Sequence, residues 1–319
     1  MDALASLLDG ARAHGAFLVR SILDPPWSLR VEDRAPLTIV AVVRGSAWVV
    51  PDHAHPVRLG LRDIVLLRGP DPYTVADDPG TPPEAVIHPG GCCRSPSGVD
   101  LCAEYELGVR TWGRSPGGST TLITGTYQMR GEVTRRLLSA LPPVAVLDER
   151  AWDPRLMSLL WDEIARDAPG QEVLLDRLLD LLLVTTLRAW FSRAAERPAW
   201  YRAHSDPAVG AALRLLHENP AHPWTVADLA ARVGVSRAAL ARRFTDLVGE
   251  PPMTYLTNRR LALAADLLRE PDATIGAVAR QVGYGSSFAL STAFKRVHGV
   301  SPQEHRLSVG RGTPSGPGA

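Results

Sequence analysis

The sequence predicts an α+β protein: a small β-barrel or sandwich, then a helical segment, then an all-α domain with two helix-turn-helix units. Three observations lead to this fold class. Short apolar stretches separated by Gly, Pro and Asp turns fill the first 150 residues, which is typical of a small β-domain. Helical periodicity takes over at Trp152. The pattern of residues 226–244 is then repeated at residues 275–294, and each copy predicts helix, tight turn and helix.

The N-terminal region begins with a predicted short helix within residues 1–20 and continues with strands. Leu37–Val50 and Arg62–Leu67 are apolar stretches of strand length, bounded by turn residues. After a loop-rich segment at residues 89–118, residues 120–129 again favour a strand. Because no long helix separates these strands, we expect one small β-domain that can hold a ligand.

Two helices follow, at Trp152–Asp167 and Glu172–Arg193. The second is apolar over an unusually wide arc, since Leu174 and Leu181 flank the leucines that form its main apolar side. Such a helix is either a core helix of a monomer or is covered on one side by a second subunit. We expect a homodimer formed through this segment.

The repeated stretch contains matching turn and capping residues. Gly234 and Gly283 occupy the same place, where a glycine can adopt the positive φ that ends a helix. Ser236 and Ser286 follow as N-caps of the next helix. Thr225, with an aspartate three residues later, predicts a capping box at the start of the first unit.

Composition and charge narrow the class of protein. The chain is 45% hydrophobic and 22% charged, has no apolar run of membrane-spanning length and begins without a basic secretory signal, so a cytoplasmic location is expected. Residues 206–319 carry 13 Lys+Arg against 9 Asp+Glu, whereas residues 1–205 carry 22 against 25. This modest basic excess supports binding of nucleic acid by the C-terminal part.

Metal binding and catalysis are poorly supported. His53 and His55 would share a strand face, but His88 is the only further histidine nearby and no suitably spaced glutamate follows. None of the usual nucleophile, phosphate-binding or metalloprotease motifs is present. We therefore expect no catalytic residues, no metal and no cofactor, and a β-domain that acts as an enzyme is the less favoured alternative.

The three cysteines are candidates for redox chemistry. Cys92 and Cys93 are adjacent and bridge each other only with strain, whereas Cys102 can pair with either if the loop between them folds back. Arg94 beside them can favour a thiolate. Redox sensing and incidental thiols both remain open.

The C-terminal motifs resemble those of the AraC/XylS family of transcription regulators. They are LAARVGVSRAALARRF, a G-x-x-P-x-x-Y-L stretch at Gly249–Leu256, Arg260, LA-x-x-LL at Leu263–Leu268, VGYGSSFALSTAFKR and GVSPQEHR. The resemblance covers residues 207–306 and implies a DNA-binding domain that contacts two major-groove faces of promoter DNA, with RNA polymerase as a further partner. A helix from Pro252 to Arg269 would span about 26 Å between the two units.

The resemblance also implies which residues read DNA. In the family, the second helix of each unit enters the groove. The matching residues here are Ser236, Arg237, Ala238, Ala241, Arg242, Ser286, Ser287, Phe288, Ala289 and Thr292. Arg242 is expected to contact a base edge, because a guanidinium can bind guanine O6 and N7 together, while Arg237 and Arg243 are expected to meet phosphate or solvent. Thr292 lacks this bidentate capacity, so the first unit should discriminate sequence more strongly.

Residues 35–148 resemble, more loosely, the cupin-like sensor domain of one branch of this family. RDIVLLRGPDPYTVADDPG, TTLITGTYQM and RRLLSALPPVAVL carry this resemblance. It implies a regulator whose N-terminal domain receives a signal, with a small-molecule effector favoured and thiol redox as the alternative. The expected domains are a cupin-like sensor at 1–150, a helical dimerisation segment at 151–195, a linker at 196–206, the DNA-binding domain at 207–306 and a disordered tail at 307–319.

Overall fold

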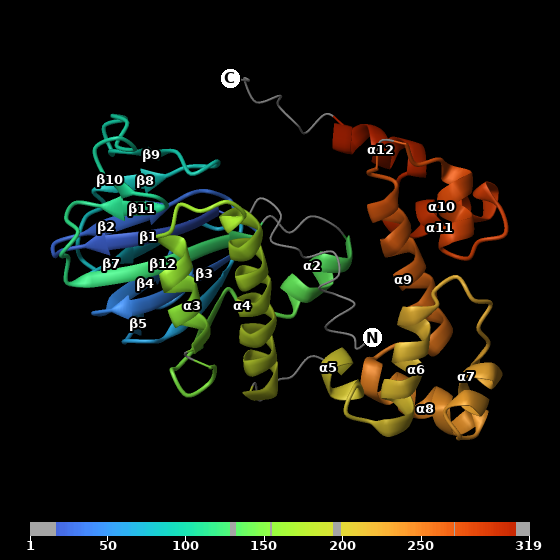
Figure 1. Ribbon diagram of the computed structural model, residues 1–319. Helices are drawn as coiled ribbons and strands as arrows, with labels where there is room; N and C mark the ends of the chain where they lie inside the picture. Colours follow the sequence, from blue (N-terminus) through green and yellow to red (C-terminus); the bar gives the residue numbers. More distant parts are fainter. Residues whose placement is uncertain (1–16, 128–131, 154, 194–198, 271, 311–319) are drawn as a thin grey trace. The chain divides into compact units, whose positions relative to one another are not determined.

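The computed structural model describes residues 17–127, 132–153, 155–193, 199–270 and 272–310. They fall into two compact units: the first contains residues 17–127, 138–153 and 155–193, and the second contains residues 132–137, 199–270 and 272–310. Figure 1 shows β-strands with two covering helices in the first unit and helices alone in the second. The predicted α+β fold class is therefore confirmed.

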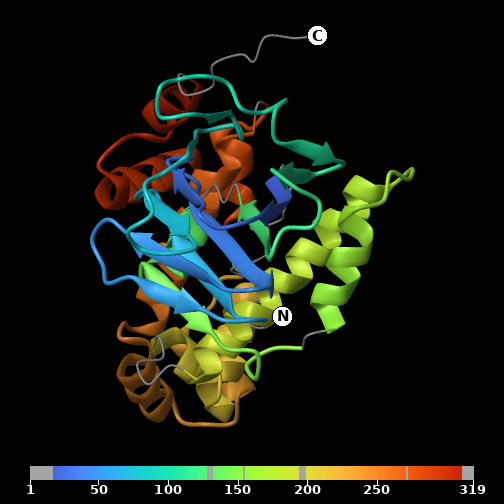
Figure 2. The same cartoon turned by 90° about the vertical axis from the view of Figure 1, so that its left-hand side faces the viewer.

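The first unit is built from two β-sheets packed face to face, as Figure 2 shows. The seven-stranded sheet has the order β10 (Glu106–Gly108), β11 (Thr111–Gly113), β1 (Phe17–Leu23), β12 (Thr120–Tyr127), β3 (Leu37–Arg44), β6 (Ile64–Arg68) and β13 (Val144–Leu147). The six-stranded sheet has the order β5 (Val57–Leu59), β4 (Ala47–Pro51), β7 (Tyr73–Ala76), β2 (Ser28–Val31), β8 (Ala85–Ile87) and β9 (Cys93–Arg94).

Both faces of the larger sheet are buried. Alternate residues of its central strands, such as Val40 and Leu122, pack against the smaller sheet in a shared core. Residues between them, such as Ile39 and Ile123, point to the opposite face and are 1% exposed. Near-continuous apolar strands such as β3 result from this burial on two sides.

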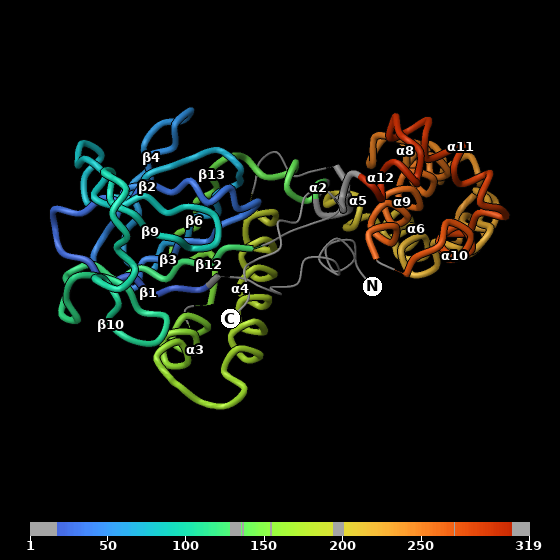
Figure 3. The backbone as a smooth tube through the Cα atoms, turned by 90° about the horizontal axis from the view of Figure 1, so that it is seen from above, coloured from blue at the N-terminus to red at the C-terminus, as the bar shows by residue number. Residues whose placement is uncertain are grey.

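Helices α3 (Arg155–Ile164) and α4 (Gln171–Arg193) lie beside the larger sheet, as Figures 1 and 3 show. The Tyr127 hydroxyl, at the end of β12, donates a 2.9 Å hydrogen bond to the Leu179 carbonyl of α4. The two predicted helices of this segment thus exist, and both belong to the same compact unit as the strands. Helix α2 (Glu132–Ser139) precedes β13.

The second unit consists of helices only. Apart from residues 132–137 of α2, they are α5 (Ala199–Ala203), α6 (Pro207–Glu218), α7 (Val226–Arg232), α8 (Arg237–Val248), α9 (Pro252–Leu267), α10 (Ile275–Gln281), α11 (Ser287–His298) and α12 (Pro302–Gly310). Asp206 caps α6 by accepting hydrogen bonds from the amides of Ala208 and Val209. Within the described residues, no helix combines the length and apolarity needed to span a bilayer.

Several boundaries differ from the prediction. Residues 17–20 belong to β1 rather than to a helix, and the rest of the predicted N-terminal helix lies outside the described residues. The expected linker at 196–206 is partly folded, because α5 packs on α8 and buries Ala203 completely. The expected disordered tail is helical as far as Gly310, while residues 311–319 lie outside the described part of the chain. The loop-rich segment 89–118 contains β9, β10 and β11.

Candidate functional site

The first helix-turn-helix unit comprises α7 and α8. The predicted capping box opens α7: the Thr225 hydroxyl accepts from the Asp228 amide at 3.1 Å, and the Asp228 carboxylate accepts from the Thr225 amide at 3.3 Å. Gly234 adopts φ +73° in the turn, and the Ser236 hydroxyl caps α8 by accepting from the Ala239 amide at 3.2 Å. The local predictions for this unit are therefore confirmed.

One face of α8 is buried and the other is open to solvent. Leu240 and Phe244 are fully buried, whereas Arg237, Ala238 and Arg242 are exposed. Arg242 forms no hydrogen bond or ion pair with any described residue, so all its guanidinium donors are available. Ser236 is exposed and Ala241 is half-buried on the same side.

Arg243, expected to meet phosphate or solvent, lies instead against an acidic group of its own domain. Its guanidinium pairs with the Asp206 carboxylate, the same group that caps α6. This ion pair connects α8 to the start of α6. Arg243 therefore has a structural partner, whereas Arg237 has none among the described residues.

The second unit, α10 and α11, repeats the geometry of the first. Gly283 adopts φ +85°, and the Ser286 hydroxyl accepts from the Ala289 amide at 3.1 Å. Helices α8 and α11 are each 12 residues long and each end at a left-handed glycine. The repeated sequence thus produces two matched helices.

The exposed surface of α11 differs chemically from that of α8. Phe288 has 79% of its surface exposed, although it is a large aromatic residue. The Thr292 hydroxyl donates to the Phe288 carbonyl at 3.0 Å, so this donor is already used within the helix. Ser286, Ser287 and Ala289 are also exposed. The second helix therefore offers hydroxyls and an aromatic ring where the first offers an arginine.

Helix α9 joins the two units into one body. Tyr255 and Leu256 in its first half belong to the core of the first unit, whereas Leu261 and Ala265 in its second half belong to the core of the second. At 16 residues, α9 is about 24 Å long. Figure 1 shows it running between α6–α8 and α10–α12.

The loop between α6 and α7 contacts α9 and the turn of the second helix-turn-helix unit. Arg260 of α9 donates to the carbonyls of Pro220 at 2.6 Å and His222 at 2.7 Å. A Cβ atom placed on Gly283 would lie 2.6 Å from the Ala221 carbonyl oxygen, whereas one placed on Gly234 would meet nothing within 4 Å. The turn of the second unit therefore packs directly on the first unit.

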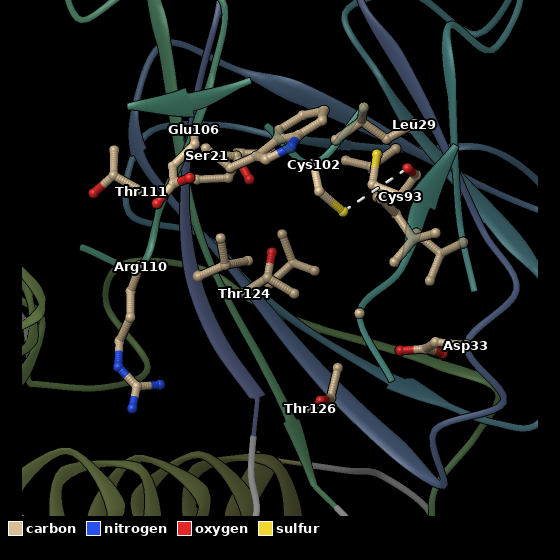
Figure 4. A pocket seen from close by; sticks show the side chains of 18 of the residues that line it. Ser21, Leu29, Asp33, Cys93, Cys102, Glu106, Arg110, Thr111, Thr124 and Thr126 are labelled. Carbon is tan, nitrogen blue, oxygen red and sulfur yellow. Dashed lines mark hydrogen bonds between the residues drawn. The ribbon is translucent and has the colours of Figure 1, made fainter. Parts of the chain in front are cut away.

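A cavity of about 530 Å³ lies between the two sheets of the N-terminal β-sheet unit. This volume is sufficient for a drug-sized molecule. Most of its lining is apolar, including Val19, Val40 and Leu122, and hydroxyls project from the larger sheet. Figure 4 shows Thr124 and Thr126 along this wall, with Arg110 and Asp33 on opposite sides of the cavity. This cavity is the place in which the β-domain could hold the predicted ligand.

The β10–β11 hairpin links this cavity to the helices. Thr111 lines the cavity and accepts a 2.9 Å hydrogen bond from Arg20, whose guanidinium lies 4.9 Å from the ring centre of Trp161 on α3. Arg110, also in the lining, lies 3.5 Å from the Glu172 carboxylate at the start of α4. A change in the cavity can therefore reach both helices through two adjacent residues.

Helix α4 exposes part of its apolar arc. Leu179 and Leu182 are buried within the N-terminal β-sheet unit, but Leu174 is 46% exposed and Leu181 is 48% exposed. These two leucines are seven residues apart and thus lie on one face of the helix. Leu159 of α3 is also exposed, at 57%. Packing within the described chain does not account for these side chains.

The segment between the cysteines folds back, as redox pairing requires. Arg94 and Asp100 form an isolated antiparallel β-bridge through their backbones, and the Leu101 amide donates to the Cys93 carbonyl at 3.0 Å. This turn places Cys93 and Cys102 in the lining of the same cavity, as Figure 4 shows. All three thiols are free, and burial raises the pKa of Cys93 to about 12. Cys102 is exposed and Cys92 is half-buried.

The histidines considered as metal ligands do not share a strand. His53 and His55 lie in the turn between β4 and β5, and both are exposed, so their expected strand placement is wrong. His88 follows β8. No group of three or more His, Cys, Asp and Glu side chains within the described part of the chain is arranged to hold a metal ion.

Comparison with known proteins matches both units. The profile of the Cupin family matches residues 2–192, a profile of the helix-turn-helix domain matches residues 229–308, and that of bacterial regulatory proteins of the tetR family matches residues 209–246. A protein of Streptomyces lividans named as an AraC-like transcription regulator is 33% identical over 314 residues, which are 96% of this chain and 98% of that protein.

Two further similarities are confined to part of the chain. The HTH-type transcriptional regulator AlkR of Acinetobacter baylyi is 35% identical over 144 residues, 45% of this chain and 47% of that protein. The DNA-binding domain of AdpA, whose crystal structure is in complex with a target DNA, is 32% identical in sequence to the matching part of this chain. The match covers 35% of this chain and 99% of that one, with a TM-score of 0.33.

The cupin profile covers more than half of the chain, and the Streptomyces lividans protein is similar along nearly its whole length. The helix-turn-helix match falls on the units formed by α7 to α11. The chain belongs to the AraC-like transcription regulators and combines an N-terminal cupin domain with a C-terminal helix-turn-helix DNA-binding domain.

Proposed function

We propose that this protein is a sequence-specific regulator of transcription rather than an enzyme, and that a signal received in its cupin domain controls its binding to promoter DNA. The observation that carries the proposal is the pair of matched helices α8 and α11, each of which exposes the face opposite its buried leucine and phenylalanine, while α9 contributes to the cores of both units. Two such helices suit successive major-groove faces of one duplex. Such a regulator works in the cytoplasm, where promoter DNA and RNA polymerase are.

Footprinting on the DNA upstream of the protein's own gene tests this function. We expect protection of two adjacent major-groove segments by the full-length chain, weakened as salt rises because phosphate contacts release counterions. Protection of a single segment would contradict the role given to α11. A chain that binds all sequences equally would contradict sequence-specific regulation.

The two units are proposed to read DNA unequally. Arg242 supplies a free guanidinium in the first unit, and this group can bind a guanine with two hydrogen bonds. In the second unit, Thr292 stands at the position of Arg242 and Phe288 at the position of Ala238, and the Thr292 hydroxyl is engaged within its own helix. The second unit therefore depends on weaker apolar and single hydrogen-bond contacts.

Phe288 is predicted to contact a thymine methyl group in the second half-site. Its ring is 79% exposed near the N-terminus of α11, where recognition helices meet base edges. Replacing that thymine by uracil removes one methyl group, so wild-type affinity should fall about fourfold. The Phe288→Ala variant should show no such difference at any position. Binding measured with each thymine of the site replaced in turn gives the answer, and equal sensitivity of both proteins to uracil would contradict the contact.

The cavity of the cupin domain is the proposed effector site. It is lined by strands of both sheets, and the β10–β11 hairpin joins its wall to α3 and α4 through Arg20 and Arg110. An occupant that moves this hairpin would shift the helices that expose Leu174 and Leu181. These contacts support a small-molecule effector that acts through the α3–α4 segment.

Replacing Leu174 and Leu181 together by serine is predicted to convert a homodimer to a monomer. The two exposed leucines lie on one face of α4, and loss of their buried area would weaken association by several kcal/mol per dimer, at about 25 cal/mol per Å². Light scattering after size exclusion measures the mass directly. Leu307→Ser serves as the control, since this leucine is 57% exposed on α12. A double variant that remains dimeric would exclude this face.

A thiol-based redox signal is the second candidate, favoured by the placement of Cys93 and Cys102 in one cavity wall. Hydrogen peroxide would take two electrons from the two thiols, forming one S–S bond and two water molecules. Mass spectrometry of the peptides should then show a loss of two hydrogens that links residues 93 and 102. If peroxide changes DNA binding in the Cys102→Ser variant as it does in the wild type, these thiols are not the sensor.

A further inference from the structure

We infer that the cavity of the cupin domain accepts uncharged, largely apolar molecules of the size of two or three fused rings and rejects carboxylic acids and other anions. The inference rests on the proposed function only in naming the cavity as the effector site. Three independent features of the lining carry it: its apolar walls, an unsatisfied hydrogen-bond donor and its distribution of charge.

The walls favour an apolar occupant. Val19 and Leu122 of the larger sheet face Leu29 and Val75 of the smaller one across the cavity, and the enclosed volume is about 530 Å³. Leu29, Val75 and Leu122 also belong to the shared core of the two sheets. An apolar ligand would thus continue an existing core, with each buried CH₂ group contributing about 0.8 kcal/mol.

One buried donor in the lining has no acceptor. The Trp112 Nε1 atom is buried and forms no hydrogen bond within the described chain, while its ring stacks on Tyr105 with 4.6 Å between ring centres. A buried N–H without an acceptor is unfavourable, and an oxygen of a ligand would satisfy it. A carbonyl or ether oxygen on an otherwise apolar molecule fits this position.

The charges of the lining disfavour an anion. Asp33, Glu106 and Glu172 contribute three carboxylates, whereas Arg110 is the one Lys or Arg in the lining and is already paired with Glu172. Arg20, behind the wall, is engaged by Thr111 and by the Trp161 ring. An incoming carboxylate would lose its hydration among three carboxylates and would compete with Glu172 for the one guanidinium, which costs more than transferring an uncharged group.

Two fluorescent probes of the same skeleton test the charge selection. N-phenyl-1-naphthylamine is uncharged, and 8-anilinonaphthalene-1-sulfonate adds one sulfonate to the same rings. Titration of the full-length protein should give a Kd for the uncharged probe that is lower by about tenfold or more. The isosteric double variant Asp33→Asn, Glu106→Gln should narrow that difference by strengthening binding of the sulfonate. Equal affinity of the wild type for both probes would overturn the inference.

The site of binding is established by filling the cavity. Thr124→Phe places a phenyl ring in the cavity, beside the threonines of the larger sheet, and should weaken binding of the uncharged probe about tenfold. Thermal unfolding of the variant shows whether its chain is folded. The Leu307→Ser variant, which removes a 57% exposed leucine of α12, controls for probe on exposed apolar surface and should bind as the wild type does. If instead this variant loses the probe and Thr124→Phe retains it, the cavity is not the binding site.

The donor is tested with 6-propionyl-2-(dimethylamino)naphthalene, an uncharged probe whose emission shifts to the red when its carbonyl accepts a hydrogen bond. Bound emission should shift to the blue in Trp112→Phe, which retains a ring but has no N–H. Unchanged emission would remove Trp112 from the inference. A probe that occupies the cavity without altering DNA binding would contradict control by an effector at this site, but it would leave the inferred selectivity of the cavity intact. An anionic effector that binds in the cavity would support control at this site and would contradict the inferred selectivity.

Discussion

Replacing Arg242 by alanine is expected to weaken DNA binding by about 10- to 100-fold, with the loss concentrated at one base pair of the first half-site. The guanidinium is exposed on α8 and has no described partner, so its removal leaves the fold intact. A bidentate contact with guanine contributes about 1–3 kcal/mol of discrimination, which corresponds to this loss. Affinities for all single-base variants of the site measure both the size and the position of the effect.

Arg237→Ala is the matched control for this prediction. Arg237 is exposed on the same helix and likewise has no described partner. As a phosphate contact, it should weaken binding by a similar factor at every sequence and reduce the salt slope by about one. Arg243 is unsuitable as a control because its pairing with Asp206 ties it to the start of α6. If Arg242→Ala lowers all affinities equally, its contact is with the backbone and the assignment is wrong.

Local sequence signals predicted the C-terminal domain well. Thr225 with Asp228, and Ser236 with Ser286, act on amides within three residues, so each cap can be inferred without knowledge of the rest of the chain. The same holds for the apolar spacing that buries Leu240 and Phe244. Helix α9 begins at the predicted Pro252 and ends two residues early, within the usual uncertainty of a helix end.

The sensor cavity could not be located in the same way, because its walls come from distant parts of the sequence. Strand β11 is three residues long and pairs in parallel with β1, about ninety residues earlier, so no periodicity indicates it. Trp112 and Thr111 thus lay in a segment that appeared only loop-rich. Its density of Gly and Pro correctly indicated turns, but short strands between those turns become visible only when their partners are known.

The paired glycines illustrate the same limit within the repeated units. Gly234 and Gly283 occupy equivalent positions and both have positive φ. The sequence correctly predicted that conformation for both. It contained no sign that Gly283 also packs on Ala221, which lies 62 residues earlier, while Gly234 faces open space. Equivalent residues of a repeat therefore differ in what they contribute to stability.

Gly283→Ala is expected to destabilise the DNA-binding domain by about 2–4 kcal/mol, well beyond the effect of Gly234→Ala. Both substitutions force alanine into a left-handed conformation, which costs about 1–2 kcal/mol. At Gly283 alone, the new Cβ would also lie 2.6 Å from the Ala221 carbonyl oxygen. The loop must then shift, and the neighbouring carbonyls of Pro220 and His222 move away from Arg260.

Calorimetry of the full-length protein separates these two costs. The transition that belongs to the DNA-binding domain is the one that operator DNA raises, because a ligand of the native state stabilises only the domain it binds. Its midpoint should fall several degrees further for Gly283→Ala than for Gly234→Ala. The shifted loop lies between the two helix-turn-helix units. Gly283→Ala should therefore reduce the affinity for the complete two-part site more than it reduces the affinity for an isolated first half-site. Equal shifts in the two variants would mean that backbone conformation accounts for the whole effect and that the contact between Gly283 and Ala221 adds nothing to the alignment of α8 and α11.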